Sequence, residues 1–270
     1  PAQRLPADTG DVEVVEGITY WQDGADDLQL DACLPREPAA DLPVLVVVHG
    51  GGFTSGDRSD SGSRGLCETA AGDGIAGFSV DYRLAPEHTY PDQVDDLSRA
   101  VEWLRQPAQV ERFGIDPARI AVLGSSAGAV LALTVGTAGS GPTDTGARVK
   151  AVVSLSGVTD FRATQQSLAG ASPEAVRLAL DYLGCRSATD CDAAAEASPI
   201  TRVDPTDPPM LLVNGTRELV PAQQADDMAA ALEAQGVPHD EVLVDGDSHG
   251  TSLLDPDVRQ RVRTFLKETL

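Results

Sequence analysis

Lysine is almost absent from this chain of 270 residues, in which only Lys150 and Lys267 occur. The 42 acidic residues outnumber the 20 basic ones, so the formal net charge is −22 at pH 7. Such a surface repels phosphate groups, which argues against nucleic acid and anionic membranes as partners and disfavours polyanionic substrates. The plainest interpretation of the charge itself is solubility or a salty habitat.

Long apolar runs and metal-binding patterns are also missing. No apolar run approaches the ~18 residues that cross a bilayer, so we expect no membrane span. No Cys/His spacing resembles a zinc site, and we expect no metal ion. The chain has no charged-then-apolar leader and begins at Pro1, which suggests processing or trimming and leaves secretion open.

The four cysteines are too few for a disulfide framework that would have to hold the fold together. Cys185 and Cys191 flank a short polar segment and predict a small loop disulfide, with two free thiols as the alternative. Cys33 and Cys67 are expected to be isolated buried thiols. A disulfide favours an oxidising compartment, so we expect secretion, with the cytoplasm as the alternative location.

The pattern of apolar runs predicts a single α/β domain over residues 1–270. Hydrophobic residues make up 41% of the chain and aromatic residues 4%, which suits an aliphatic core over a parallel sheet. The predicted strands are an edge hairpin within 12–34 and the runs 44–48, 75–81, 120–123, 149–156, 210–214 and 241–244. Four helices are predicted: one that starts at Pro91, one that follows Ser126, and the segments 221–235 and about 256–269. The alternation of strands and helices predicts a mostly parallel sheet of about eight strands with helices on both faces.

The segment 158–209 interrupts this alternation. Within it, Ser172 is a good helix cap, Pro173 suits the first helical position, and Gly184 ends the helix. We interpret the segment as a small lid over the site.

Gly124-Ser125-Ser126-Ala127-Gly128 is a Gly-x-Ser-x-Gly pentapeptide between a strand-like run and a helix-forming run. A strained strand-to-helix turn of this kind exposes the central hydroxyl as a nucleophile. A second match, Gly246-Asp247-Ser248-His249-Gly250, enters a loop, and no histidine follows it to act as a base for Ser248. The context therefore selects Ser126.

A glycine run, His49-Gly50-Gly51-Gly52-Phe53, directly follows the predicted strand 44–48. Consecutive glycines let backbone N–H groups approach a bound group closely and point at a developing oxyanion, although glycine runs also make plain turns. Because the serine pentapeptide follows some 75 residues later, we predict an oxyanion hole here.

Four ordered motifs resemble the α/β-hydrolase esterases of the hormone-sensitive lipase type. They are the glycine run, the segments Asp81–His88 and Phe113–Ile120, and the serine pentapeptide. Within that group the chain is most similar to compact bacterial esterases related to acetylxylan and feruloyl esterases. The resemblance extends from about residue 12 to the C-terminus.

The resemblance implies Ser126 as nucleophile, His249 as base, and the backbone N–H groups of Gly51, Gly52 and Ala127 as the oxyanion hole. His249 follows the last predicted strand on a loop and precedes the final helix, as this fold requires. The other three histidines lie in the glycine run, in a motif that is structural in such families, and at the start of a strand: His49, His88 and His239.

The acid departs from the family pattern, which usually has an aspartate three residues beyond a glycine. Here Glu218 follows Gly215 in a loop that looks one residue short, and its longer side chain can offset the tighter loop. Asp160, after the preceding strand, is the alternative acid. Asp245 and Asp247 are less attractive because they lie close to His249 on its own loop.

These residues predict a cofactor-independent serine carboxylesterase that hydrolyses short-acyl or aromatic esters through an acyl-enzyme. The expected partner is a small-molecule ester. One alternative is an arylformamidase or small amidase or peptidase, since a triad does not choose the leaving group. The other is a non-catalytic binding protein on a hydrolase scaffold.

Overall fold

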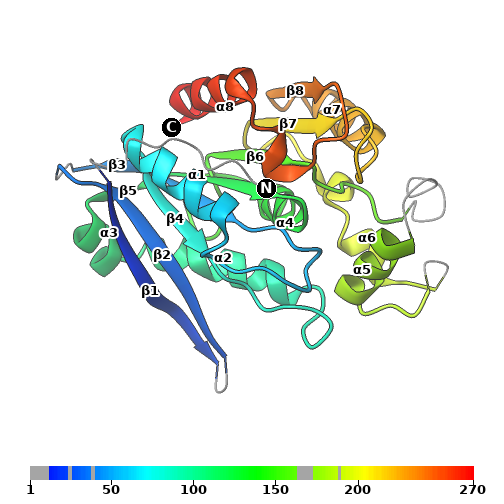
Figure 1. The fold of residues 1–270 in the computed structure, drawn as a ribbon, viewed down its shortest axis with the longest axis horizontal. Coiled ribbons are helices and arrows are strands. Elements are labelled where there is room, and N and C mark those ends of the chain that lie inside the picture. Colours follow the sequence, from blue (N-terminus) through cyan, green and yellow to red (C-terminus); the bar gives the residue numbers. More distant parts are fainter. Residues whose placement is uncertain (1–11, 24–25, 38–39, 163–172, 188–189) are drawn as a thin grey trace.

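The computed structural model describes residues 12–23, 26–37, 40–162, 173–187 and 190–270 (Figure 1). Ser172, which we expected to cap a helix, lies outside the described residues.

Eight strands form one sheet in the order β1-β2-β4-β3-β5-β6-β7-β8. The two N-terminal strands form an antiparallel hairpin at one edge, β2 pairs antiparallel with β4, and every other pair is parallel. The mostly parallel sheet and the edge hairpin are confirmed. The strands are β1 (Val12–Asp23), β2 (Asp26–Pro35), β3 (Leu42–Val48), β4 (Ala76–Val80), β5 (Ile115–Ser125), β6 (Ala151–Leu155), β7 (Met210–Gly215) and β8 (His239–Val244).

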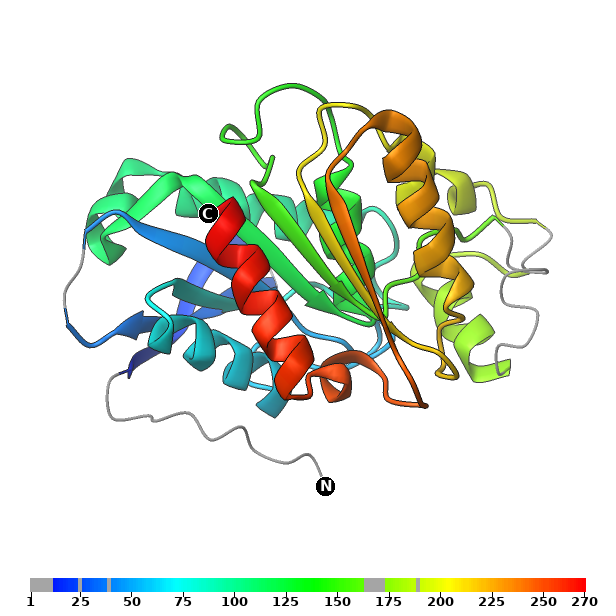
Figure 2. The same ribbon diagram turned by 90° about the horizontal axis from the view of Figure 1, so that it is seen from above.

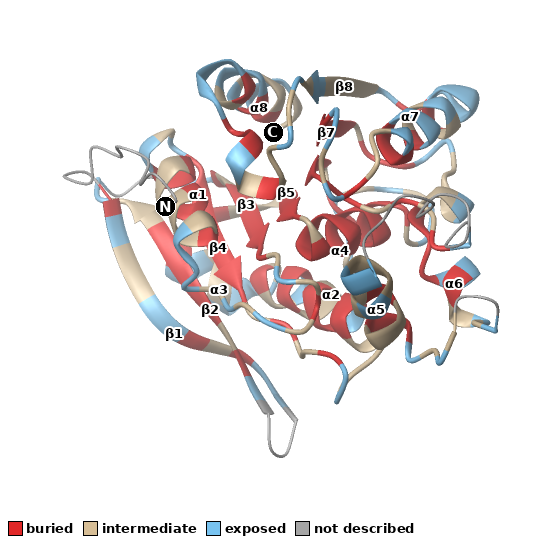
Figure 3. Ribbon diagram, turned by 45° about the vertical axis from the view of Figure 1, so that its right-hand side comes forward, coloured by how far each residue is buried: buried red, intermediate tan, exposed pale blue. Residues whose placement is uncertain are grey.

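Helices cover both faces of the sheet, as Figure 2 shows. In β3, Val44 and Val46 belong to the core layer that contains residues of α2, α4 and α7, whereas Leu45 and Val47 belong to the layer that contains residues of α1 and α8. Both faces of the central strands are therefore buried, which explains their continuous apolar sequences (Figure 3). The helices are α1 (Ser61–Gly72), α2 (Asp92–Leu104), α3 (Pro107–Phe113), α4 (Ala127–Gly136), α5 (Pro173–Leu183), α6 (Ala193–Glu196), α7 (Gln223–Gln235) and α8 (Pro256–Thr269).

Helix α5 belongs to the segment 158–209 and lies beside the glycine run. Its Tyr182 ring is fully buried and stacks on Phe53 with centroids 3.8 Å apart. The Tyr90 backbone N–H donates to the Tyr182 carbonyl at 2.7 Å. Gly184, with φ of 66°, follows the helix in the left-handed region, as its sequence position predicted.

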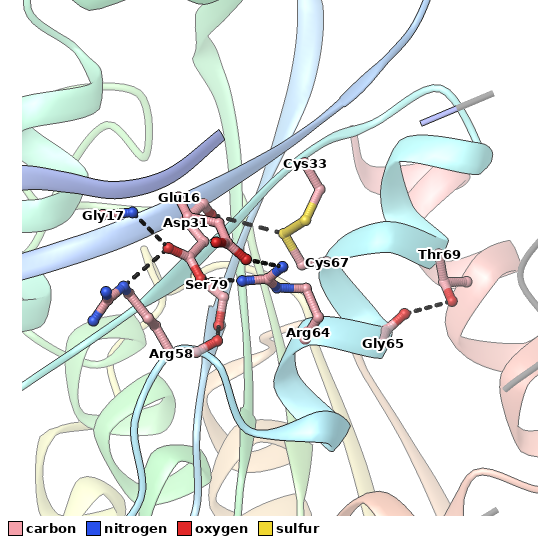
Figure 4. Close-up of a disulfide and its surroundings, with 10 residues drawn as sticks. All are labelled: Glu16, Gly17, Asp31, Cys33, Arg58, Arg64, Gly65, Cys67, Thr69 and Ser79. Carbon is pink, nitrogen blue, oxygen red and sulfur yellow. Dashed lines mark hydrogen bonds and ion pairs between the residues drawn. A yellow bond between two sulfur atoms is a disulfide. The ribbon is translucent and has the colours of Figure 1, made fainter. Parts of the chain in front are cut away.

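Two disulfides join the four cysteines. The predicted Cys185–Cys191 disulfide is confirmed. The expectation of isolated thiols at Cys33 and Cys67 is wrong, because these residues form a disulfide that joins β2 to α1 (Figure 4). Helix α1 was not predicted from the sequence, so nothing indicated that Cys67 would lie against the strand that carries Cys33.

A buried carboxylate next to this disulfide ties the loop after the glycine run to the sheet (Figure 4). The Asp31 side chain is 1% exposed; it accepts from the Gly17 N–H at 2.8 Å and forms ion pairs with Arg58 and Arg64. Arg58 also forms an ion pair with Asp81 at 2.6 Å. The start of α1 therefore has a fixed position over the carboxyl ends of the strands.

Candidate active site

Ser126 lies on a strained turn between β5 and α4. Its φ of 54° and ψ of −116° are rare for a residue with a Cβ. The turn is tight on both sides, because a Cβ at Gly124 would lie 2.0 Å from the Gly128 carbonyl oxygen, and one at Gly128 would lie 2.3 Å from the Val48 carbonyl oxygen. The two glycines of the pentapeptide are therefore required by packing.

His249 reaches this serine from the loop after β8. Its Nε2 lies 2.8 Å from Ser126 Oγ, and the histidine is 123 residues further along the chain. The histidine side chain is 29% exposed, at the wall of a cleft. The backbone N–H groups of Thr216 and Arg217, just after β7, donate to the carbonyls of Val244 and Gly246 at 2.9 Å each, which fixes the histidine loop to the neighbouring loop.

Glu218 completes the chain of contacts behind the histidine. Its Oε2 makes a short contact with His249 Nδ1, and its side chain is 0% exposed. Its other oxygen, Oε1, accepts from the Gly215 N–H at 2.7 Å and from Ser156 Oγ at 2.7 Å. With one oxygen held by these donors and the other on the ring nitrogen, the carboxylate can orient the imidazole and stabilise it when protonated.

The other acids lie elsewhere. Asp160 forms an ion pair with Arg162 at 2.8 Å and lies 3.4 Å from Ser198 Oγ, so its carboxylate contacts other residues of the segment that follows β6. Asp245 is exposed and pairs with Arg217 at 2.7 Å. Asp247 is exposed on the histidine loop. The structure brings Glu218, and not these three, into contact with His249.

Three residues with backbone N–H groups line the same cleft as Ser126. They are Gly51, Gly52 and Ala127, and among the described residues none of their N–H groups donates in a backbone hydrogen bond outside the helices and strands. Gly51 has φ of 113°, and a Cβ there would lie 2.0 Å from the Ser55 carbonyl oxygen, so only glycine fits. Unpaired N–H groups beside a nucleophile can hold an oxyanion.

His49 contacts the glycine run and the Tyr82 ring. Its ring stacks on Tyr82 with centroids 4.2 Å apart, and its Nδ1 lies 2.7 Å from the Gly50 carbonyl oxygen, to which it can donate. Burial lowers the pKa of His49 below its ordinary value, which favours the neutral ring beside the cleft.

The cleft has a volume of about 500 Å³ and two chemically different walls. One wall is apolar and comes largely from α4, the segment 158–209 and the loop after Glu218; it includes Val130, Val158, Phe161, Leu178, Leu219 and Val220. The other wall is polar and comes from the start of α1 and the loop after His249; it includes Asp60, Ser61, Ser63 and Thr251. An amphipathic molecule fits such a cleft.

Ser156 is a site residue that the sequence analysis missed. It directly follows β6, is 0% exposed, and has φ of 62°. Its hydroxyl donates to Glu218 Oε1 at 2.7 Å and accepts from the Gly250 N–H at 2.8 Å. The available signal was its place at the end of a predicted strand, since the other site residues follow strands at the same edge.

Two further observations concern the part of the chain that the structure describes. No group of three or more His, Cys, Asp or Glu side chains in it is arranged to hold a metal ion. None of its helices has the length and apolar character needed to cross a membrane.

The sheet order, the turn at Ser126 and the histidine loop after β8 define an α/β hydrolase, the fold class that the sequence predicted. The family model described as BD-FAE matches residues 30–232. The chain therefore belongs to the BD-FAE family.

Known relatives agree with this assignment. Esterase LipC of Mycobacterium tuberculosis is 33% identical over 237 residues, which are 82% of this chain and 55% of LipC. The chain spans about half the length of the curated relatives it matches.

Two solved structures are similar along nearly the whole chain. A truncated carbohydrate esterase from gut microbiota matches with a TM-score of 0.82 and 21% identity over 98% of both chains. The propionate-bound thermophilic esterase Est2 of Thermogutta terrifontis matches with a TM-score of 0.73 and 25% identity, over 98% of this chain and 96% of Est2.

Proposed function

We propose that this protein is a serine carboxylesterase in which Ser126, His249 and Glu218 form the catalytic triad. The observation that carries the proposal is the 2.8 Å contact between Ser126 Oγ and His249 Nε2, with the Glu218 carboxylate on the opposite ring nitrogen. A hydroxyl, an imidazole and a buried carboxylate in this order are the groups that acyl transfer needs.

In the first half-reaction, Ser126 Oγ forms a bond to the ester carbonyl carbon as its proton passes to His249 Nε2. The carbonyl electron pair moves to oxygen, and the N–H groups of Gly51, Gly52 and Ala127 stabilise the oxyanion. When the carbonyl re-forms, the bond to the alcohol breaks and the alcohol leaves with the proton from Nε2. Water then repeats the sequence on the acyl-enzyme and releases the carboxylic acid.

The two walls of the cleft support a proposal for where the two halves of the ester bind. The apolar wall suits a short acyl chain or an aromatic acyl group, and the polar wall suits an alcohol with hydroxyl groups. The propionate in the Est2 structure and the carbohydrate named for the gut esterase are consistent with these two halves. We also propose that segment 158–209 acts as a lid, because it supplies Phe161 and Leu178 to the apolar wall.

We infer that Leu178 limits the length of the acyl chain. Its Cδ1 lies 2.6 Å from the position of a Cβ on Gly52, so it packs directly on the glycine run at the apolar wall. Leu178→Ala should raise the ratio of kcat/KM for p-nitrophenyl hexanoate over acetate by about 10-fold, since one methylene in an apolar pocket changes discrimination by roughly 10-fold or more.

Leu180→Ala is the matched control, because Leu180 lies on the same helix and does not line the cleft. Its hexanoate-to-acetate ratio should stay near the wild-type value. An unchanged ratio in Leu178→Ala, or the same change in both variants, would contradict the assignment of Leu178.

The proposed activity is tested with the purified protein and p-nitrophenyl acetate. Hydrolysis should be measurable and should stop after treatment with a fluorophosphonate, which bonds covalently to an activated serine. Mass mapping should locate the adduct on the peptide that contains Ser126. Faster hydrolysis of the matched anilide than of the ester would favour the amidase alternative, and no turnover of either would favour a binding protein.

We propose in addition that the protein works in an oxidising compartment. The Cys33–Cys67 and Cys185–Cys191 disulfides support this location, because disulfides persist in secreted proteins and are rare where thiols are kept reduced.

A further inference from the structure

Ser156 forms hydrogen bonds with Glu218 and with Gly250, the residue next to His249, at one buried point. It directly follows β6, the strand that precedes β7 along the chain. In this protein the carboxylate comes from Glu218 after β7, and the residue after β6 supplies a hydroxyl to that carboxylate at 2.7 Å.

The chemistry of its two partners fixes the direction of the serine hydroxyl. The Gly250 backbone N–H can only donate, so it must use a lone pair of Ser156 Oγ, at 2.8 Å. The Glu218 carboxylate can only accept, so the single hydroxyl proton of Ser156 points to Oε1. Among the described residues, the hydroxyl forms no other hydrogen bond.

The two oxygens of Glu218 therefore have different partners. Oε1 accepts from Ser156 and from the Gly215 N–H, with the Asn214 side-chain amide further away at 3.4 Å. Oε2 is left for His249 Nδ1. Fixed donors on one oxygen hold the plane of the carboxylate, so its other oxygen stays in place on the imidazole.

The backbone at Ser156 indicates that a side chain is required there. Its φ of 62° lies in the left-handed region, which glycine adopts without strain and serine does not favour. Strain of this kind persists where the surroundings compensate for it. The two hydrogen bonds of the hydroxyl are the visible compensation.

We propose that Ser156 is a positioning residue of the triad: its hydroxyl fixes the orientation of the Glu218 carboxylate and, through it, the imidazole of His249. The inference rests on the proposed serine esterase function. Ser156 also lines the cleft, but its hydroxyl is bonded to Glu218 and Gly250, so in this role it acts through Glu218.

Ser156→Ala should lower kcat for p-nitrophenyl acetate by about 10-fold and leave KM within about twofold, because a hydrogen bond to a charged group is lost while the cleft is kept. Ser156→Gly should behave alike, and it removes the hydroxyl at a position where glycine relieves the backbone strain. If the alanine variant fails to fold, the glycine variant still tests the proposal.

Ser198→Ala is the matched control. Ser198 is also buried, accepts from the Phe161 N–H at 2.7 Å, donates to the Ala194 carbonyl at 2.6 Å, and has no partner in the triad. Its kcat should stay within about threefold of wild type although the same kind of buried hydroxyl is lost.

A double-mutant cycle with Glu218→Ala separates positioning from a general structural role. If Ser156 acts through the carboxylate, Ser156→Ala should cost about 10-fold in the wild-type background and less than about twofold once Glu218 is alanine. Equal losses in both backgrounds, or a loss no larger than that of Ser198→Ala, would overturn the proposal.

If Ser126→Ala retains wild-type activity, the proposed triad is wrong and this inference is wrong with it. If Ser126→Ala is inactive and Ser156→Ala is unaffected, only the positioning role is refuted.

Discussion

Ser126→Ala is expected to lower kcat for p-nitrophenyl acetate by about 10⁵-fold or more, the largest single effect in this protein, because loss of the nucleophile removes the acyl-enzyme route. The remaining N–H groups and the cleft would still bind the ester. Alanine keeps the Cβ, so the strain at φ of 54° is unchanged and the melting temperature should not fall. Steady-state kinetics and thermal unfolding of the same preparation test both statements.

Ser248→Ala provides the sharpest control for that result. Ser248 is the central serine of the second Gly-x-Ser-x-Gly match, so both variants remove a hydroxyl from the same sequence pattern. We expect kcat of Ser248→Ala within about threefold of wild type, since within the described part of the chain its hydroxyl forms no hydrogen bond with a triad side chain. An inactive Ser248→Ala together with an active Ser126→Ala would reverse the choice between the two pentapeptides.

The strands were predictable because their apolar sequences reflect burial on both faces of the sheet. Runs such as Val44–Val48 are apolar at every position, and a strand covered on both faces requires this. Residues 120–123 predicted only part of β5, which extends from Ile115 to Ser125. Residues 116–119 of this strand are only partly buried and include Asp116, Pro117 and Arg119, so they lose the apolar signal.

Helix α1 was missed for the opposite reason. Its sequence, from Ser61 to Gly72, contains three glycines and little helix-forming signal. Leu66 and Ala70 pack against the sheet and Cys67 forms a disulfide with β2, so tertiary contacts stabilise a helix that local preference does not. The same omission explains why the Cys33–Cys67 disulfide could not be predicted.

The site was predictable up to its third member. Ser126 and His249 are marked by motifs and chain order, whereas an acid can follow either of two strands that end at the same edge of the sheet. The sequence favoured Glu218 as the acid but left Asp160 as an alternative. Only the path of the loop after Gly215 decides which carboxylate reaches the imidazole. Ser156 carries no motif at all, because its importance lies in contacts with residues 62 and 94 positions away.

Glu218→Gln is expected to lower kcat by about 10³–10⁴-fold, while Asp160→Asn should stay within about threefold of wild type. The reason lies in the partners of the two oxygens. Ser156 and the Gly215 N–H both donate to Oε1, so a glutamine must place its carbonyl oxygen there and present its NH₂ group to His249 Nδ1. Nδ1 must then accept, and the neutral ring carries its proton on Nε2.

That tautomer places an N–H, and not a lone pair, against Ser126 Oγ at the 2.8 Å contact, so the histidine cannot take the serine proton. Asp160→Asn changes no group that touches the imidazole, since Asp160 pairs with Arg162. Steady-state assays with p-nitrophenyl acetate measure kcat of both variants, and thermal unfolding checks that each variant is folded. A collapse of kcat in Asp160→Asn with an active Glu218→Gln would identify Asp160, which follows β6, as the acid. It would also contradict the positioning role proposed for the hydrogen bond from Ser156 to Glu218.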